Sequence, residues 1–216
     1  AQQFRWTGAD IHESLGETYQ AMSGEAASTM SQAATANPQL DFLVRTNMDA
    51  QIAADRIRGA VRASNGVSYP GGSLANQLKL IAKMIRGGLR TRVFYASMGG
   101  FDTHSDIHET LDEKFDELNA ALRTFVTEIK AMGRWDDVVI VPVSEFGRTL
   151  TSNGRGTDHG WGGHNMVLGG SVRGGQVLGR YPHGVLESEF YTGRGRIIPS
   201  TPFDALWRPV AEWFGV

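Results

Sequence analysis

The sequence predicts an α/β fold in which a parallel sheet is flanked by helices. Two short apolar segments, 92–97 and 138–144, have the β-branched and aromatic composition of strands. Between them, residues 107–132 repeat large apolar side chains at helical spacing. A strand, a helix and a second strand in this order favour a right-handed parallel crossover. We therefore expect an α/β core over 73–216, with a helical region over 1–72 that packs on it or precedes it.

Further helices are predicted before and after this strand–helix–strand unit in the sequence. Residues 11–36 are rich in Ala, Ser and Gln, which suits one or two short helices with a thin apolar stripe. Residues 39–62 and 74–89 carry Leu, Ile and Val near the three-and-four spacing of a helix. Residues 201–214 read as one more apolar-faced helix, which we expect to be interrupted or kinked at Pro209.

The stretch 147–179 contains eleven glycines and few large apolar side chains. A short third strand is predicted over 166–168, and 173–179 has the composition of a hairpin turn with a strand. A segment with so much backbone freedom needs a ligand, a metal ion or tight packing to order it.

The composition narrows the class of partner. The formal net charge is −2 over 216 residues, with acidic and basic side chains intermixed, so we do not expect a nucleic-acid partner. No apolar run approaches the roughly 20 residues that cross a bilayer. The absence of cysteine excludes disulfides and thiolate ligands. The chain begins with Ala1 rather than methionine, as expected of a processed or partial chain.

Three turns combine carboxylate and imidazole side chains, which are the ligands that borderline divalent metals accept. The first turn holds Asp102 and His104, whose spacing of two aims both side chains the same way. The second holds Glu145, directly after the strand predicted over 138–144. Because parallel strands end at the same sheet edge, Asp102 and Glu145 are expected to be neighbours.

The third turn carries Asp158, His159 and, after three intervening glycines and a tryptophan, His164. Two imidazoles and one carboxylate with an open position are a usual catalytic zinc arrangement. Arg148 could bind an oxyanion, because its guanidinium fork fits phosphate or sulfate. The predicted metal ligands are Asp102, His104, Glu145, Asp158, His159 and His164.

Each of these assignments has a structural alternative. Asp102 could cap the helix that follows it, and Glu145 could form an ion pair with Arg148. The glycine-rich turn could carry solvated histidines without a ligand. The sequence has no Gly-x-Ser-x-Gly elbow, no phosphate-binding loop and no His-Glu-x-x-His helix, so the nucleophile is unassigned.

Four motifs resemble, in order and spacing, the second half of the bacterial DUF1501 family. They are Gly-Gly-Phe-Asp-Thr-His (99–104), Val-Ser-Glu-Phe-Gly-Arg (143–148), Gly-Thr-Asp-His-Gly (156–160) and Leu-Gly-Gly (168–170). That family looks like a distant relative of the alkaline phosphatase superfamily, which includes phosphatases, sulfatases and cofactor-independent phosphoglycerate mutases. The resemblance implies an alkaline-phosphatase-like half domain, with a metal-lined sheet edge where a serine or threonine attacks phosphate or sulfate esters.

Carried over by position, Asp102 and His104 resemble the superfamily's ligands after one strand. Glu145 sits where the superfamily has the aspartate of an Asp-His pair, and His159 or His164 resembles the later histidine. These correspondences agree with the ligand set expected from the residues themselves.

Two departures accompany the resemblance. Phe146 occupies the place of the paired histidine, which differs from the pattern that holds a second metal ion. Family members are also about twice as long, and their first half carries an export signal and, in the superfamily, supplies the nucleophile. The resemblance thus implies a periplasmic or secreted protein whose site is completed by a missing N-terminal segment or a second chain.

The expected function is hydrolysis of phosphate or sulfate esters with a divalent metal ion, zinc, manganese or calcium. The substrate would be a small-molecule or glycan anionic ester. The alternative is a degenerate family member, that is, a non-catalytic binding module stabilised by metal.

Overall fold

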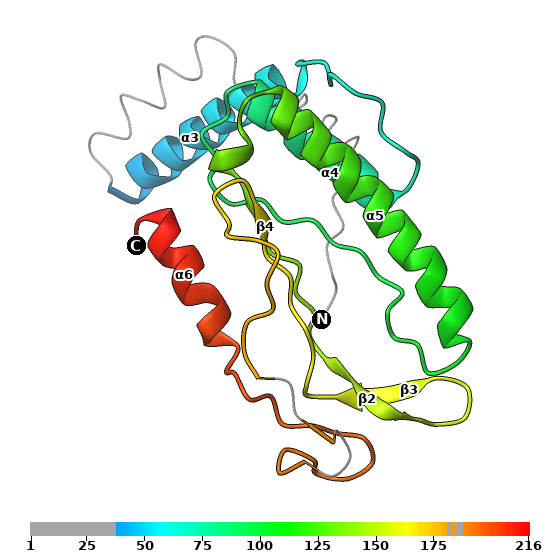
Figure 1. Ribbon diagram of the computed structural model, residues 1–216. Helices are drawn as coiled ribbons and strands as arrows, with labels where there is room; N and C mark the ends of the chain where they lie inside the picture. Colours follow the sequence, from blue (N-terminus) through cyan, green and yellow to red (C-terminus); the bar gives the residue numbers. More distant parts are fainter. Residues whose placement is uncertain (1–37, 181–182, 185–187) are drawn as a thin grey trace. The chain divides into compact units, whose positions relative to one another are not determined.

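The computed structural model describes residues 38–180, 183–184 and 188–216. The chain divides into two units, Ala1–Gly59 and Ala60–Val216, each of which is described by itself. The described part of the first unit belongs to helix α3 (Pro38–Val61), which confirms the helix predicted over 39–62 (Figure 1). The helices predicted within 11–36 lie outside the described residues.

Three further helices are confirmed. They are α4 (Ser73–Arg86), α5 (Ile107–Ala131) and α6 (Asp204–Phe214). α6 contains Pro209 and continues through it, so the interruption expected at this proline is not found. None of the helices in the described ranges has the length and apolar character that a membrane crossing requires.

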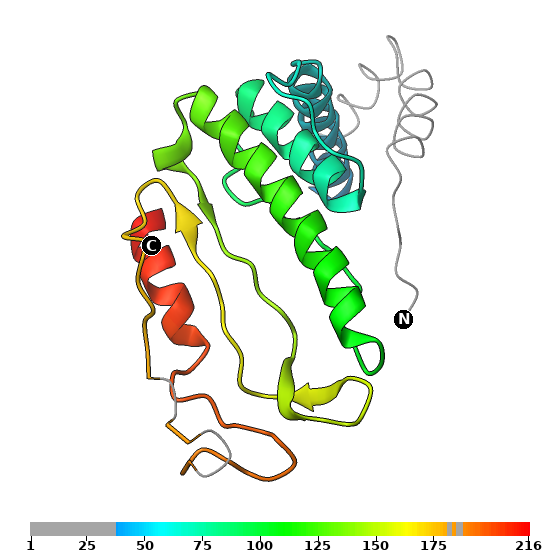
Figure 2. The same cartoon turned by 45° about the vertical axis from the view of Figure 1, so that its right-hand side comes forward.

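The hydrophobic core lies between α4 and α5, which run side by side in both ribbon views (Figures 1 and 2). Leu74, Leu78 and Ile81 of α4 are buried against Phe125 and Ile129 of α5. Their spacing of three and four residues places them on one face of each helix. This face is the stripe that the sequence predicts.

The strands form two small antiparallel pairs. β1 (Val139–Ile140) pairs with β4 (Leu168–Gly169), and β2 (Gly147–Ser152) pairs with β3 (Thr157–Gly160). The described chain is therefore a mixed α/β structure, and the predicted parallel sheet is not found in it. The strand expected over 138–144 is reduced to the two residues of β1.

The strand predicted over 92–97 is replaced by irregular backbone. Its alternate side chains Phe94 and Ala96 pack against the helical core, as those of a strand would. The main chain is instead held by a side chain: the Gln77 amide donates to the Ser97 carbonyl and accepts from the Ser97 N–H, both at 2.9 Å. A side-chain amide can satisfy one residue in this way but cannot extend a ladder.

The glycine-rich stretch 147–179 contains the β2–β3 hairpin, for which no strand was predicted. The strand predicted over 166–168 appears one to two residues later as β4. The hairpin expected over 173–179 is irregular in the structure.

A buried carboxylate anchors the segment that precedes α4. Glu128 of α5 is 0% exposed and accepts hydrogen bonds from the Gly66 N–H (2.8 Å), Asn65 (3.0 Å) and Arg86 (3.2 Å). Burial opposes its ionisation, but the Tyr69 hydroxyl together with these hydrogen bonds outweighs that effect. The pKa of Glu128 therefore lies below its ordinary value.

Candidate metal site

The loop that leads into α5 presents Asp102 and His104 on the same side. The His104 N–H donates to the Asp102 carbonyl at 3.2 Å, which forms a turn, and His104 Nδ1 lies 2.9 Å from Asp102 Oδ1. The N-cap of α5 is Asp106, which has left-handed backbone (φ 50°). Asp102 is thus not the helix cap, and its carboxylate faces the histidine.

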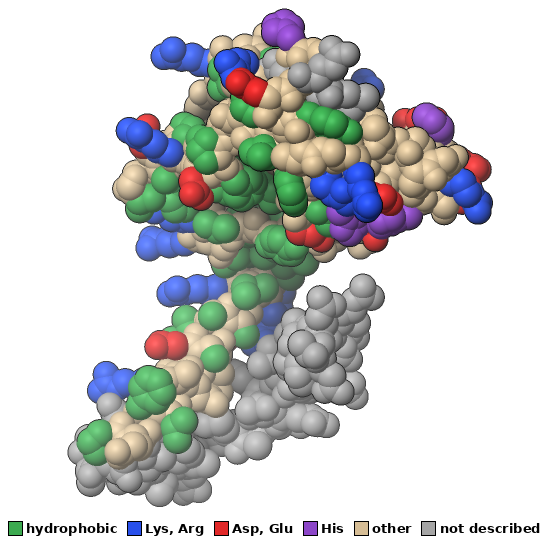
Figure 3. Space-filling model, turned by 90° about the horizontal axis from the view of Figure 1, so that it is seen from below, with side chains coloured by type: hydrophobic (Ala, Val, Ile, Leu, Met, Phe, Trp, Pro, Cys, Tyr) green, Lys and Arg blue, Asp and Glu red, His purple; other side chains and the backbone are tan. Residues whose placement is uncertain are grey.

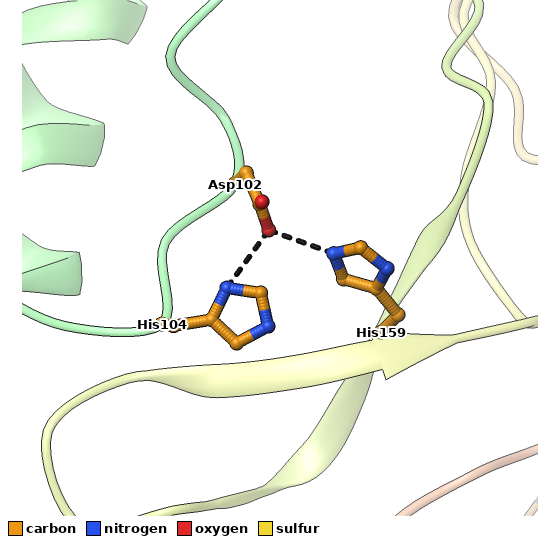
Figure 4. Close-up of side chains that lie close together, drawn as sticks. All are labelled: Asp102, His104 and His159. Atoms are coloured by element: carbon orange, nitrogen blue, oxygen red, sulfur yellow. Dashed lines mark hydrogen bonds and ion pairs between the residues drawn. The ribbon is translucent and has the colours of Figure 1, made fainter.

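The β2–β3 hairpin brings two more side chains to the same carboxylate. Its register places Arg148 opposite His159, and opposite residues of an antiparallel pair share one face of the sheet. His159 Nε2 lies 2.7 Å and an Arg148 terminal nitrogen 2.9 Å from Asp102 Oδ1. Figure 4 shows the Asp102 carboxylate between the two imidazole rings, one from the loop and one from β3. We call Asp102, His104 and His159 the Asp102 cluster.

Arg148 is held by Thr157 as well as by Asp102. Its Nε donates to the Thr157 hydroxyl at 2.9 Å, and a terminal nitrogen donates to the Thr157 carbonyl. Together with the Asp102 contact, three of the five guanidinium N–H groups are used. Within the described part of the chain, two N–H groups remain for a ligand beside the cluster.

Phe146 fixes the orientation of the His159 ring. The two rings stack with centroids 4.1 Å apart and planes 8° from parallel. The His104 ring lies 5.0 Å from the His159 ring, centroid to centroid. Stacking on one side and the Asp102 contact at Nε2 leave His159 little rotational freedom.

The site is open to solvent. Asp102, His104 and His159 side chains are 56%, 48% and 49% exposed. Figure 3 shows histidine, basic and acidic side chains adjoining one another on the surface of the molecule. The hydrogen bond from His159 lowers the pKa of the Asp102 carboxyl, and the Arg148 hydrogen bond and the His104 charge act in the same direction, against desolvation. Asp102 is therefore an ionised acceptor at neutral pH.

A family model described as "Protein of unknown function (DUF1501)" matches residues 9–187, well over half of the chain. The chain belongs to the DUF1501 family. The matched range includes Arg148 and all three residues of the Asp102 cluster. No curated protein and no solved structure matches the chain.

The DUF1501 chain offers a donor set suited to a divalent ion. One atom from each residue of the Asp102 cluster lies within 4.8 Å of the other two, giving two imidazole nitrogens and one carboxylate oxygen. In a tetrahedral zinc site, ligand atoms are about 3.4 Å apart, because each lies about 2.1 Å from the ion. The donors here are closer, at 2.7 and 2.9 Å from Asp102 Oδ1. Exposed side chains can separate by the roughly 0.5 to 0.7 Å that this requires, so the three residues are compatible with an ion.

Three other predicted ligands of this DUF1501 chain lie outside the Asp102 cluster. Asp158 precedes His159 on β3, and its carboxylate accepts a hydrogen bond from Asn153 at 3.2 Å. Glu145 is exposed and does not pair with Arg148, whose ion-pair partner is Asp102. His164 lies four residues after the end of β3. Metal binding by these three residues stays a prediction.

Two residues of this DUF1501 chain contact the site but are not among the site residues predicted from the sequence. Thr157 orients Arg148, and Asn153 contacts the main chain of His104 at 3.1 Å. The dipeptide Asn153-Gly154, which follows the alternate threonines Thr149 and Thr151, is a signal for a β-hairpin turn. This signal indicates the turn that joins β2 to β3, the hairpin that carries Thr157 and His159.

Proposed function

We propose that this DUF1501 protein is a divalent-metal-dependent hydrolase of phosphate or sulfate esters. The observation that carries the proposal is the convergence of His104, His159 and Arg148 on one carboxylate oxygen of Asp102. A cation site adjacent to a guanidinium with spare N–H groups suits a tetrahedral oxyanion. Neither feature alone would indicate ester hydrolysis.

Asp102, His104 and His159 would hold the ion, which supplies Lewis acidity when bound. Imidazole nitrogens favour zinc or manganese over calcium, which prefers oxygen ligands. Arg148, oriented by Thr157, would bind a non-bridging oxygen of the phosphate or sulfate group, which is not part of the bond that breaks. In the net reaction, water adds to phosphorus or sulfur, the bond to the ester oxygen breaks, and that oxygen leaves as an alcohol.

The finer assignments rest on the family resemblance. We propose an alkaline-phosphatase-like half domain whose parallel sheet is completed by further polypeptide, either an N-terminal segment or a second chain. That polypeptide would supply a serine or threonine nucleophile. In the chain alone, water would attack the ester directly, as in the net reaction, with lower turnover. A periplasmic or secreted location belongs to the same proposal.

A second candidate function is a non-catalytic binding module stabilised by metal. The exposure of about half of each side chain of the Asp102 cluster favours it, because catalytic sites gain electrostatic strength by excluding water. In this case the ion would link the loop before α5 to the β2–β3 hairpin without turning over an ester.

The two candidates differ in turnover. The purified chain would be loaded with Zn²⁺ or Mn²⁺ and assayed on p-nitrophenyl phosphate and p-nitrophenyl sulfate, with and without EDTA. The hydrolase predicts turnover that EDTA abolishes and that His159→Ala and Arg148→Lys each reduce at least about tenfold. Arg123→Lys, a change of the same type on an exposed position of α5, is the matched control. Bound metal without turnover supports the module, and absence of bound metal contradicts both.

A further inference from the structure

The Asp102 cluster is assembled from two segments that are far apart in the sequence. Asp102 and His104 belong to the loop before α5, whereas His159 follows 55 residues later on β3. The contacts among their side chains are exposed, and exposed ion pairs contribute little to stability. Other contacts must therefore hold the hairpin against the loop.

The main chain of the β2–β3 turn lies directly on the main chain of the loop. The Thr157 N–H donates to the carbonyl of the buried Thr103 at 3.1 Å. Gly156 approaches so closely that an added Cβ would lie 2.4 Å from the Thr103 oxygen and 2.5 Å from the His104 carbonyl carbon. A side chain at position 156 would push the two segments apart.

Asn153 ties these two segments together with its carboxamide. Its Nδ2 donates to the His104 carbonyl at 3.1 Å and to Asp158 Oδ1 at 3.2 Å. Its Oδ1 accepts the N–H groups of Arg155 (3.1 Å) and Gly156 (2.8 Å). Both donors and both acceptor positions of the amide are thus used. One half of the side chain shapes the turn, and the other half bridges to the ligand-bearing loop.

We propose that Asn153 is a positioning residue of the metal site, which acts by holding the main chain of His104 at the distance from His159 that lets both bind one ion. This inference rests on the proposed function. Residues that orient metal ligands typically change metal affinity by about 10- to 100-fold when they are replaced. Gly156 is part of the same device, because its missing side chain permits the close approach.

The test is Zn²⁺ affinity measured by titration calorimetry on the full chain. Asn153→Ala and Gly156→Ala are each expected to weaken binding about tenfold or more. Gly174→Ala is the matched control for the glycine, since nothing lies within 4 Å of an added Cβ there and its φ is not positive. Asn119→Ala, on an exposed position of α5, is the matched control for the asparagine. Both controls are expected to bind Zn²⁺ as the wild type does.

Asn153→Asp separates the two halves of the amide. Aspartate keeps the oxygens that accept from the turn but loses the donors to His104 and Asp158. It also places a carboxylate beside Asp158, where the wild-type amide donates a hydrogen bond. Both Asn153→Asp and Asn153→Ala are therefore expected to loosen the bridge and to bind Zn²⁺ more weakly than the wild type. Zn²⁺ affinity that is unchanged in both Asn153→Ala and Asn153→Asp would overturn the proposal and leave Asn153 as a turn residue.

A second readout needs no metal. Amide hydrogen exchange of Thr157 reports whether the turn stays on the loop, because this N–H is bound to Thr103. Faster exchange of Thr157 in Asn153→Ala, with unchanged exchange of core amides such as Ile129, supports the docking role. Equal exchange in wild type and variant rejects it. If the wild type binds no Zn²⁺, the proposed function fails, while this exchange measurement still decides whether Asn153 positions His104.

Discussion

At the scale of single residues, the site depends on Asp102, whose Oδ1 atom meets three partners. The two histidines and Arg148 lie 2.7 to 2.9 Å from this oxygen, and the carboxylate is more than half exposed. Exposed ion pairs of this kind add little to the free energy of unfolding. Replacement of Asp102 should therefore weaken binding of the divalent ion and leave the fold intact.

Glu128 is the opposite case, a buried carboxylate whose role is structural. Glu128→Gln keeps the shape and an acceptor but removes the charge that receives Arg86, Asn65 and the Gly66 N–H. We expect the free energy of unfolding at pH 7 to fall by about 2 kcal/mol, as for hydrogen bonds to charged groups. Urea unfolding measures this, with Glu113→Gln on an exposed position of α5 as the control.

The difference in free energy of unfolding between wild type and Glu128→Gln is expected to depend on pH. The pKa of Glu128 is lowered on folding, so its charge stabilises the protein fully above the ordinary glutamate pKa of about 4.3. This contribution is lost as the pH falls through the lower pKa of the folded state. The difference between wild type and Glu128→Gln should shrink on acidification, and a difference that is constant from pH 7 to pH 3 would contradict this assignment.

At the scale of elements, the pairing of α4 with α5 carries the core. Leu78 is 6% exposed, whereas Leu80 of the same helix is 45% exposed. Leu78→Ala is expected to lower the free energy of unfolding by about 3 kcal/mol, and Leu80→Ala by less than about 1 kcal/mol. Chemical denaturation of the two variants gives the comparison, and equal losses would show that this helix face does not form the core in solution.

The helices were predictable and most of the strands were not, for a physical reason. Helix periodicity is local, so the steps from Leu74 to Leu78 and Ile81 already mark the buried face. A strand requires a neighbouring strand to hydrogen-bond with. Residues 92–97 show the alternating burial of a strand, but the Gln77 side chain forms the hydrogen bonds of the Ser97 main chain. The pattern of hydrophobic residues in the sequence carries no information about this hydrogen bonding by a side chain.

At the scale of the whole molecule, the sequence predicts that residues from distant turns converge on one site. The structure shows such a convergence, but a different contact between segments produces it. Asp102 and Glu145 were expected to be neighbours along a parallel sheet edge. The structure instead brings Asp102 to His159, because the β2–β3 hairpin docks on the loop before α5. Arg148 was predicted to bind an oxyanion from its guanidinium alone. Its position opposite His159 follows from hairpin register, which glycine-rich composition did not reveal.

Asp102, His104 and His159 are proposed to bind one divalent ion together. Calorimetric titration of the full chain with Zn²⁺ tests this claim directly, in wild type, Asp102→Asn, His159→Ala and the exposed control Asp112→Asn. We predict one ion per chain, an affinity loss of at least about tenfold in both site variants, and no change in the control. Absence of binding by the wild type, or equal affinity in all four proteins, would contradict the claim.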